Sequence, residues 1–189
     1  HRAKNIGILE QSTVSLAAGL SKAGLIPVVH SIAPFLVNRA YEQIKIDFGY
    51  QNLRGNIITV GASHDYASLG STHHCPEDIN LISNIPNINI IVPGNSIEFD
   101  LLFKQSLKSK NCNYYRLDSN EHAKNIAVKF GKIELLKKGK EINIIVVGPS
   151  LRFLDMFFKD LKANIFYVTT IEPFDHSIFK RTKIYSKKW

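Results

Sequence analysis

Short apolar runs alternate with amphipathic stretches along the first 120 residues. The apolar runs are rich in Ile and Val, as is typical of parallel strands buried on both faces. The amphipathic stretches repeat apolar residues with the helical period. We therefore expect an α/β fold, a parallel sheet with helices on both faces, which binds ligands beyond the carboxyl ends of its strands. The predicted strands are Asn5–Leu9, Ile26–His30, Asn56–Gly61, Asn89–Val92 and Asn113–Leu117, and the predicted helices are Gln11–Ala23, Asn38–Tyr50, Pro76–Ile85 and Ser96–Ser109.

A polar stretch, Asp118–Lys124, follows the last of these strands. We expect one domain over residues 1–120 and the beginning of a second α/β domain over residues 121–189. The sequence does not begin with Met, so we expect further sequence before His1. The second unit is predicted to contain strands Ile142–Val147 and Ile165–Thr170 and a helix, Leu151–Leu161.

The composition of the 189 residues, 44% hydrophobic and 21% charged, is that of a globular protein with a core. The sequence has no apolar run long enough to predict a membrane span. Its two cysteines, Cys75 and Cys112, form no CxxC motif and no disulfide framework. This cysteine usage predicts a reduced, cytoplasmic protein.

The net charge of +8 is unevenly distributed. Residues 1–103 carry 6 Lys and Arg against 8 Asp and Glu, whereas residues 104–189 carry 18 against 8. The excess lies in lysine-rich patches, Lys137–Lys140 and Lys180–Lys188, with little aromatic interleaving and no RNA-binding signature. The pattern favours a solvated basic face, and we predict no nucleic-acid partner and no membrane partner.

Candidate chemistry gathers where predicted strands end. Glu10 stands between a strand and a helix, where a carboxylate either serves a ligand or simply stabilises the helix N-terminus. The loop between residues 63 and 76 holds His64, His73 and His74, three of the seven histidines, followed by Cys75. Histidines there suit hydrogen bonding, proton transfer or metal binding, but the spacing is not that of a zinc site. We therefore predict no metal ligands in this chain, and a purely structural loop is the alternative.

Taken in chain order, several segments resemble the transketolase family of thiamine-diphosphate enzymes. The resemblance covers nearly the whole chain and implies the pyrimidine-binding domain, without its first strand and helix, followed by the opening of the C-terminal domain. The segments are Ile6–Gln11 with Ala17–Leu20, Phe35 with Arg39–Gln43, His64 with Gly70–His73, Glu77–Ile79 with Ile85–Asn87 and Ile91–Pro93, and, later, Val146–Ser150 and Thr170–Asp175.

The resemblance implies a role for each motif residue. Glu10 would hydrogen-bond the aminopyrimidine of thiamine diphosphate and favour the tautomer that activates the thiazolium carbon. Phe35, which by position alone is more typical of a core residue, would stack on the same ring. His73 would assist proton transfer at the substrate hydroxyls, and His64 would help bind the sugar or its phosphate. His74, which replaces the usual Gln, would lie in the same substrate site.

The sequence departs from the family pattern at the substrate side. The loop from His64 to His73 is three residues shorter than in ordinary transketolases, and their acidic sugar-contacting residue has no clear counterpart. Ser119 stands where the family has a phosphate-binding Arg, although Arg116 is nearby. The segment from Phe35 to Arg39 also carries one residue more than in deoxyxylulose-phosphate synthases. These departures leave the donor and acceptor sugars open.

The family binds the cofactor diphosphate and Mg²⁺ through a "GDG…N" segment, which this sequence lacks. The resemblance therefore implies that a missing part of the chain or a partner subunit supplies that half, as in split transketolases. The site would form at an interface in a homodimer or heterotetramer, and this chain alone would be inactive.

The leading hypothesis is a transketolase-like enzyme half that transfers a two-carbon ketol unit between sugars or sugar phosphates. Alternatives are a deoxyxylulose-phosphate-synthase-like enzyme, an oxo-acid dehydrogenase E1β-like enzyme, and a non-catalytic structural or regulatory subunit. The retention of Glu10, Phe35 and His73 favours an enzyme, since a non-catalytic subunit has no physical need for them.

Overall fold

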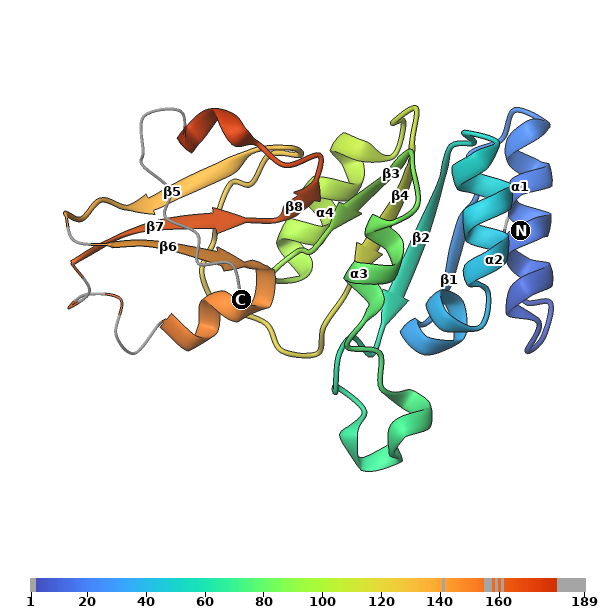
Figure 1. Cartoon of the computed structure of the whole chain (residues 1–189), viewed down its shortest axis with the longest axis horizontal. Coiled ribbons are helices and arrows are strands. Elements are labelled where there is room, and N and C mark those ends of the chain that lie inside the picture. Colours follow the sequence, from blue (N-terminus) through green and yellow to red (C-terminus); the bar gives the residue numbers. More distant parts are fainter. Residues whose placement is uncertain (1–2, 141, 155–157, 159, 161, 180–189) are drawn as a thin grey trace.

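The computed structural model describes residues 3–140, 142–154, 158, 160 and 162–179 (Figure 1). Its strands are β1 (Val28–Ile32), β2 (Gly55–Val60), β3 (Ile88–Ile91), β4 (Cys112–Arg116), β5 (Ile133–Lys137), β6 (Ile142–Val147), β7 (Ala163–Val168) and β8 (Thr170–Glu172). Its α-helices are α1 (Glu10–Lys22), α2 (Tyr41–Gln43), α3 (Asp78–Ser83) and α4 (Ser96–Ser106). Shorter helical turns are the π-helices η1 (Pro34–Asn38) and η2 (Ile44–Tyr50) and the 3₁₀ turns η3 (Ala67–Leu69), η4 (Ser71–His73), η5 (Gly148–Leu154) and η6 (His176–Phe179).

The first sheet has the strand order β1-β2-β4-β3-β8, with the first four strands parallel and β8 antiparallel to β3. Side chains alternate between its two faces, as the pleat of a strand requires. Tyr114 and its neighbour Ile57 pack with α1 and α3 on one face, and Tyr115 packs with α4 on the other. The expected α/β fold, a parallel sheet with helices on both faces, is confirmed (Figure 1).

The predicted strand Asn5–Leu9 is wrong. The Gly7 amide donates a hydrogen bond to Asn5 Oδ1 over 2.9 Å, and Gly7 has a φ of +90°, so the backbone turns there. Ile8 is 85% exposed. An apolar segment becomes a strand only beside a hydrogen-bonding neighbour, and β1 pairs with β2 instead.

Two predicted helices also differ. Residues 38–50 do not form one α-helix, since a π-helical turn ends at Asn38 and α2 passes into a second π-helix, η2. A π-helix has a wider turn than the hydrophobic period used to predict an α-helix, so the pattern placed the helix without showing its type. The predicted helix Leu151–Leu161 begins within the 3₁₀ turn η5, and most of its remaining residues lie outside the described part of the chain. The patch Lys180–Lys188 lies wholly outside the described residues.

The second unit contains a three-stranded sheet in the order β5-β7-β6. Its strands β6 and β7 correspond to the two predicted strands and run parallel, and β5 is an unpredicted strand that runs antiparallel to β7. Strand β8 then leaves this unit and joins the first sheet, where Ile90 lies opposite Glu172. The two sheets are therefore linked through β7 and β8. Within the described residues, no helix is long and apolar enough to cross a membrane.

A buried polar group joins the two units, and we call it the junction cluster: Gly94, Glu98, His122 and Tyr167. Glu98 accepts hydrogen bonds from Tyr167 Oη at 2.6 Å and from the Gly94 amide at 2.8 Å. His122 Nε2 lies 3.2 Å from the other carboxylate oxygen and 2.8 Å from Tyr167 Oη. The side chains of Glu98 and His122 are both 0% exposed. Burial raises the pKa of Glu98 above its usual range.

Candidate active site

The parallel strands β1 and β2 both end at the edge of the sheet where ligands are expected. The segment after β1 enters η1, which carries Phe35 and ends before Arg39. The Arg39 amide donates to the Pro34 carbonyl over 3.2 Å, a five-residue step that is characteristic of a π-helical turn. The π-helical turn therefore accommodates the one residue by which the segment from Phe35 to Arg39 is longer than in deoxyxylulose-phosphate synthases.

Glu10 is the first residue of α1, and its residue exposure is 7%. Arg39 Nη1 donates a hydrogen bond to Glu10 Oε2 over 2.8 Å. No other side chain or amide in the described part of the chain donates a hydrogen bond to this carboxylate. Glu10 thus has a fixed orientation and an oxygen available for a ligand.

Phe35 links this ion pair to the loop of residues 64–75, which we call the histidine loop. The Arg39 Cζ atom lies 4.6 Å from the centre of the Phe35 ring, and the His73 ring meets Phe35 edge-on with centroids 5.3 Å apart. Thr72 Oγ1 lies 3.0 Å from His73 Nδ1 and holds that imidazole. Glu10, Arg39, Phe35 and His73 form one continuous group, which we call the edge site.

The other two predicted histidines lie against each other. The rings of His64 and His74 meet edge-on, with centroids 4.8 Å apart. His74 Nε2 is buried and has no hydrogen-bond partner among the described residues. No group of three or more His, Cys, Asp or Glu side chains in the described part of the chain is arranged to hold a metal ion. Burial also raises the pKa of the Cys75 thiol to about 12, which opposes its ionisation as a ligand.

The base of the histidine loop is anchored to the sheet. Ser63 and Cys75 form an antiparallel bridge, in which the Cys75 amide donates to the Ser63 carbonyl over 2.9 Å. Arg116, at the end of β4, donates to the Ser63 hydroxyl and, over 2.7 Å, to Asp78 Oδ2. Tyr114 Oη donates to the same oxygen over 2.9 Å. Arg116 therefore holds the loop in place and does not enter the edge site.

A second loop contact fixes the segment after β4. Asp65 accepts a hydrogen bond from the Ser119 amide over 2.8 Å. Desolvation by burial raises the pKa of Asp65, and the neighbouring Asp118 raises it further. Sequence reasoning missed Asp65 and Asp78, and it quoted Arg39 only as a motif residue. The available signals were the position of Asp65 in the loop after the predicted strand Asn56–Gly61 and that of Asp78 in the first turn of the predicted helix Pro76–Ile85.

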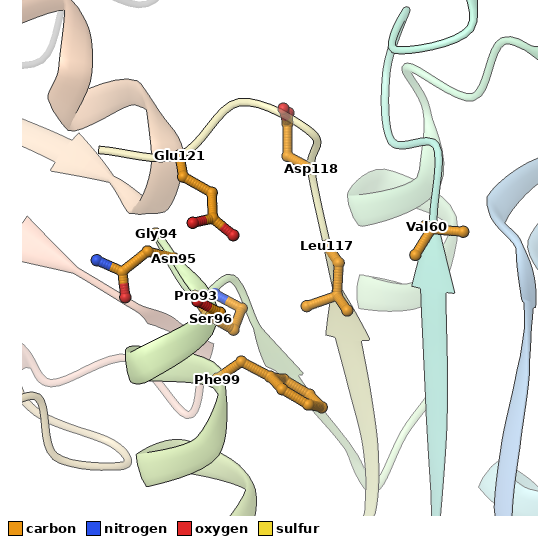
Figure 2. A pocket seen from close by; sticks show the side chains of 9 residues that line it. All are labelled: Val60, Pro93, Gly94, Asn95, Ser96, Phe99, Leu117, Asp118 and Glu121. Carbon is orange, nitrogen blue, oxygen red and sulfur yellow. The ribbon is translucent and has the colours of Figure 1, made fainter. Parts of the chain in front are cut away.

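A separate cavity of about 230 Å³ lies near the ends of β2, β3 and β4 (Figure 2). Phe99 and Leu117 form part of its apolar wall, and Glu121 lies at its polar side. None of the predicted site residues is among those that line it, which are Val60, Pro93, Gly94, Asn95, Ser96, Phe99, Leu117, Asp118 and Glu121.

The fold defines an α/β domain with a parallel sheet, a class of domain that usually binds ligands at the carboxyl edge of the sheet. The profile of the family described as "Transketolase, pyrimidine binding domain" matches residues 1–118, and the chain belongs to this family. The family resemblance predicted from the sequence is thereby confirmed.

Several known proteins are similar to this chain along most of its length. The chain is 36% identical over 175 residues to an "Uncharacterized 33.6 kDa protein in fasciation locus" of Rhodococcoides fascians, covering 93% of this chain and 56% of that protein. It is 31% identical over 183 residues to an apulose-4-phosphate transketolase subunit of Actinobacillus succinogenes, covering 92% and 59%. The solved structure "Split gene transketolase, inactive beta4 tetramer" superimposes with a TM-score of 0.79 at 26% identity, covering 93% and 59%. The chain thus spans somewhat more than half the length of these relatives.

Proposed function

We propose that this chain supplies the pyrimidine-binding half of a thiamine-diphosphate-dependent transketolase-like enzyme. The enzyme would transfer a two-carbon ketol unit between sugars or sugar phosphates. The observation that supports the proposal most directly is the edge site, where a buried carboxylate, an aromatic ring and a histidine meet. These three side chains come from the start of α1, the turn after β1 and the loop after β2.

The residues present fit the pyrimidine half of the cofactor. Glu10 is buried enough for a strong hydrogen bond, and within the described residues only Arg39 donates to it. A carboxylate can share a proton with a ring nitrogen, which a neutral amide cannot do. Phe35 offers an apolar face for stacking. When bound, the cofactor supplies the carbon nucleophile and stabilises the carbanion that develops on the transferred unit.

His73 is suited to moving a proton at the substrate. Its Nδ1 is engaged by the Thr72 hydroxyl, so Nε2 is the nitrogen left to face a sugar hydroxyl. The edge contact with Phe35 places this imidazole beside the ring on which we expect the cofactor to stack. We assign His73 to proton transfer, and His64 and His74 to contacts with the sugar.

The diphosphate and Mg²⁺ would be held outside this chain segment, by a partner subunit or by another part of the same protein. The described residues offer no set of metal ligands. A related structure is titled an inactive beta4 tetramer, which supports the inference that chains of this type need a second component for activity. We propose a homodimeric or heterotetrameric assembly whose active site lies at an interface.

Substrate recognition differs from that of ordinary transketolases. Ser119 replaces the usual arginine, its amide is bound by Asp65, and Arg116 is committed to Asp78 and Ser63. A substrate phosphate or other anion would therefore be bound without an arginine at position 119 and without Arg116. His74 Nε2 has no partner among the described residues, but it is buried, so a sugar hydroxyl would reach it only after the loop moved.

The test is reconstitution of the full-length protein with the co-purifying protein that carries a "GDG…N" segment. If the partner supplies the diphosphate half, we expect thiamine diphosphate uptake and ketol transfer from a ketose to an aldose in the complex, and neither by this protein alone. Transfer by the full-length protein alone would assign the diphosphate half to the same chain. Release of CO₂ from pyruvate would instead indicate a synthase-like or E1β-like enzyme. A complex that takes up no cofactor would contradict the catalytic proposal and leave a non-catalytic subunit.

A further inference from the structure

Arg39 makes the two contacts that the proposed function gives to the aminopyrimidine ring. Its guanidinium hydrogen-bonds Glu10 over 2.8 Å, and its Cζ atom lies 4.6 Å from the Phe35 ring centre. A guanidinium is planar, carries N–H donors and stacks on aromatic faces, as an aminopyrimidine does. We propose that Arg39 occupies the seat of the aminopyrimidine ring and must move aside when the cofactor binds. This inference rests on the proposed function.

The exposure of the ion pair indicates which partner covers the other. The Glu10 side chain is 9% exposed, whereas the Arg39 side chain is 41% exposed. The carboxylate therefore faces inward and the guanidinium faces outward. An arginine that only braced Glu10 from behind would be the more buried partner. Arg39 instead has the position of a cover over the carboxylate.

The local backbone explains how Arg39 reaches this place. In the wide turn of a π-helix, residues separated by four positions lie on nearly the same side. Arg39 follows Phe35 by four positions, directly after η1, and its amide closes the last five-residue step onto Pro34. The segment carries one residue more than in deoxyxylulose-phosphate synthases, and the π-helical turn that contains it places the Arg39 guanidinium over the Phe35 ring.

The competition is expected to be moderate. A half-exposed ion pair and a half-exposed cation–π contact are each weak, and the cofactor replaces both with similar contacts. Their loss on cofactor binding should weaken the observed affinity about three- to tenfold relative to a chain without the guanidinium. Arg39 would then raise the cofactor concentration at which half of the sites are occupied.

The test measures thiamine diphosphate binding, in the presence of Mg²⁺, by calorimetric titration of the full-length protein in complex with its partner. Arg39→Ala removes both contacts and should bind the cofactor about three- to tenfold more tightly. Arg39→Lys keeps the charge without the planar fork and should show a smaller gain. The matched control is Arg54→Ala, because Arg54 bonds the Gly24 carbonyl over 3.1 Å at the amino ends of β1 and β2. This control should leave the affinity unchanged.

The outcomes separate this inference from the function on which it rests. Unchanged or weaker cofactor binding by Arg39→Ala, with wild-type thermal unfolding, would show that Arg39 braces the site and would overturn the inference alone. If Arg39→Ala does not fold, the same comparison is made with Arg39→Lys. Absence of binding by the wild-type complex, and by Glu10→Gln alike, would overturn the proposed function together with this inference.

Discussion

The edge site and the junction cluster contain the same kinds of side chain, a glutamate, a histidine and an aromatic ring, in two different settings. In the junction cluster, Glu98 and His122 are fully buried, and both are hydrogen-bonded to Tyr167. In the edge site, the carboxylate has one donor among the described residues, and that donor is 41% exposed. Residue types alone therefore do not distinguish a structural cluster from a functional one.

The difference between the two groups is their exposure, which supports the proposal that the edge site is the functional one. The junction cluster closes on itself, and any side chain at Gly94 would collide with His122 and Tyr167. Burial of this kind stabilises the contact between the two units. The edge site is held by loops at the ligand-binding edge of the sheet, where its groups can exchange partners. The comparison predicts that mutations in the edge site change binding and rate, whereas mutations in the junction cluster change stability.

The largest expected effect is that of Glu10→Gln on catalysis. The amide keeps the size of the side chain but cannot share a proton, so kcat should fall about 10²- to 10⁴-fold. The free energy of unfolding should change by less than about 1 kcal/mol, because the lost ion pair is half-exposed. Steady-state kinetics and denaturant unfolding of the reconstituted complex measure both quantities. Glu42→Gln, on the exposed side of α2, is the control, and equal losses in both variants would contradict the assignment.

The second effect is that of Glu98→Ala on stability. Removal of this buried side chain leaves His122, Tyr167 and the Gly94 amide without their acceptor. Each buried group left unsatisfied costs about 1–3 kcal/mol, so the total should be about 3–5 kcal/mol. The exposed pair of Asp100 and Lys104, with side chains 57% and 71% exposed, provides the control. Asp100→Ala should cost no more than about 0.5 kcal/mol. Chemical denaturation measures the free energy of unfolding of both variants. Similar losses in the two would contradict the stabilising role that we assign to the junction cluster.

The sequence predicted the sheet in outline because the apolar runs that form its strands are local features. The residues of the edge site were found differently, since the resemblance to the transketolase family, and not the apolar pattern, gave Glu10, Phe35 and His73 their roles. The strand Asn5–Leu9 was predicted wrongly because pairing depends on a neighbour, and β5 was missed because charged residues surround it. The contact of Arg39 with Glu10 joins residues 29 positions apart, and that of Tyr167 with Glu98 joins residues 69 apart. Contacts at such separations depend on the strand order, which the local pattern does not contain.

A third prediction concerns the anchor of the histidine loop. Arg116→Met leaves the fully buried Asp78 without its cation and should destabilise the protein by about 2–3 kcal/mol. The loop should also shift, so KM for the sugar should rise more than kcat falls. Asp78→Asn in the same chain removes the unpaired charge and should recover part of the stability but not the loop position. Full recovery of KM would show that Arg116 does not position the loop.

The smallest expected effect is the pH dependence of the junction cluster. The pKa of Glu98 is raised by burial, so the native state holds this proton more tightly than the unfolded state does. The resulting stabilisation is complete below the unfolded pKa of 4.5 and is lost as the pH rises through the higher folded pKa. Glu98→Gln cannot ionise, so its stability relative to the wild type should increase across that window, by about 1.4 kcal/mol for each pH step of one. Unfolding curves of the two proteins from pH 4.5 upward measure the difference. If the stability of Glu98→Gln relative to the wild type instead stays constant or falls with pH, Glu98 is ionised in the native state. The junction cluster would then be an ion pair and not a neutral hydrogen-bonded group.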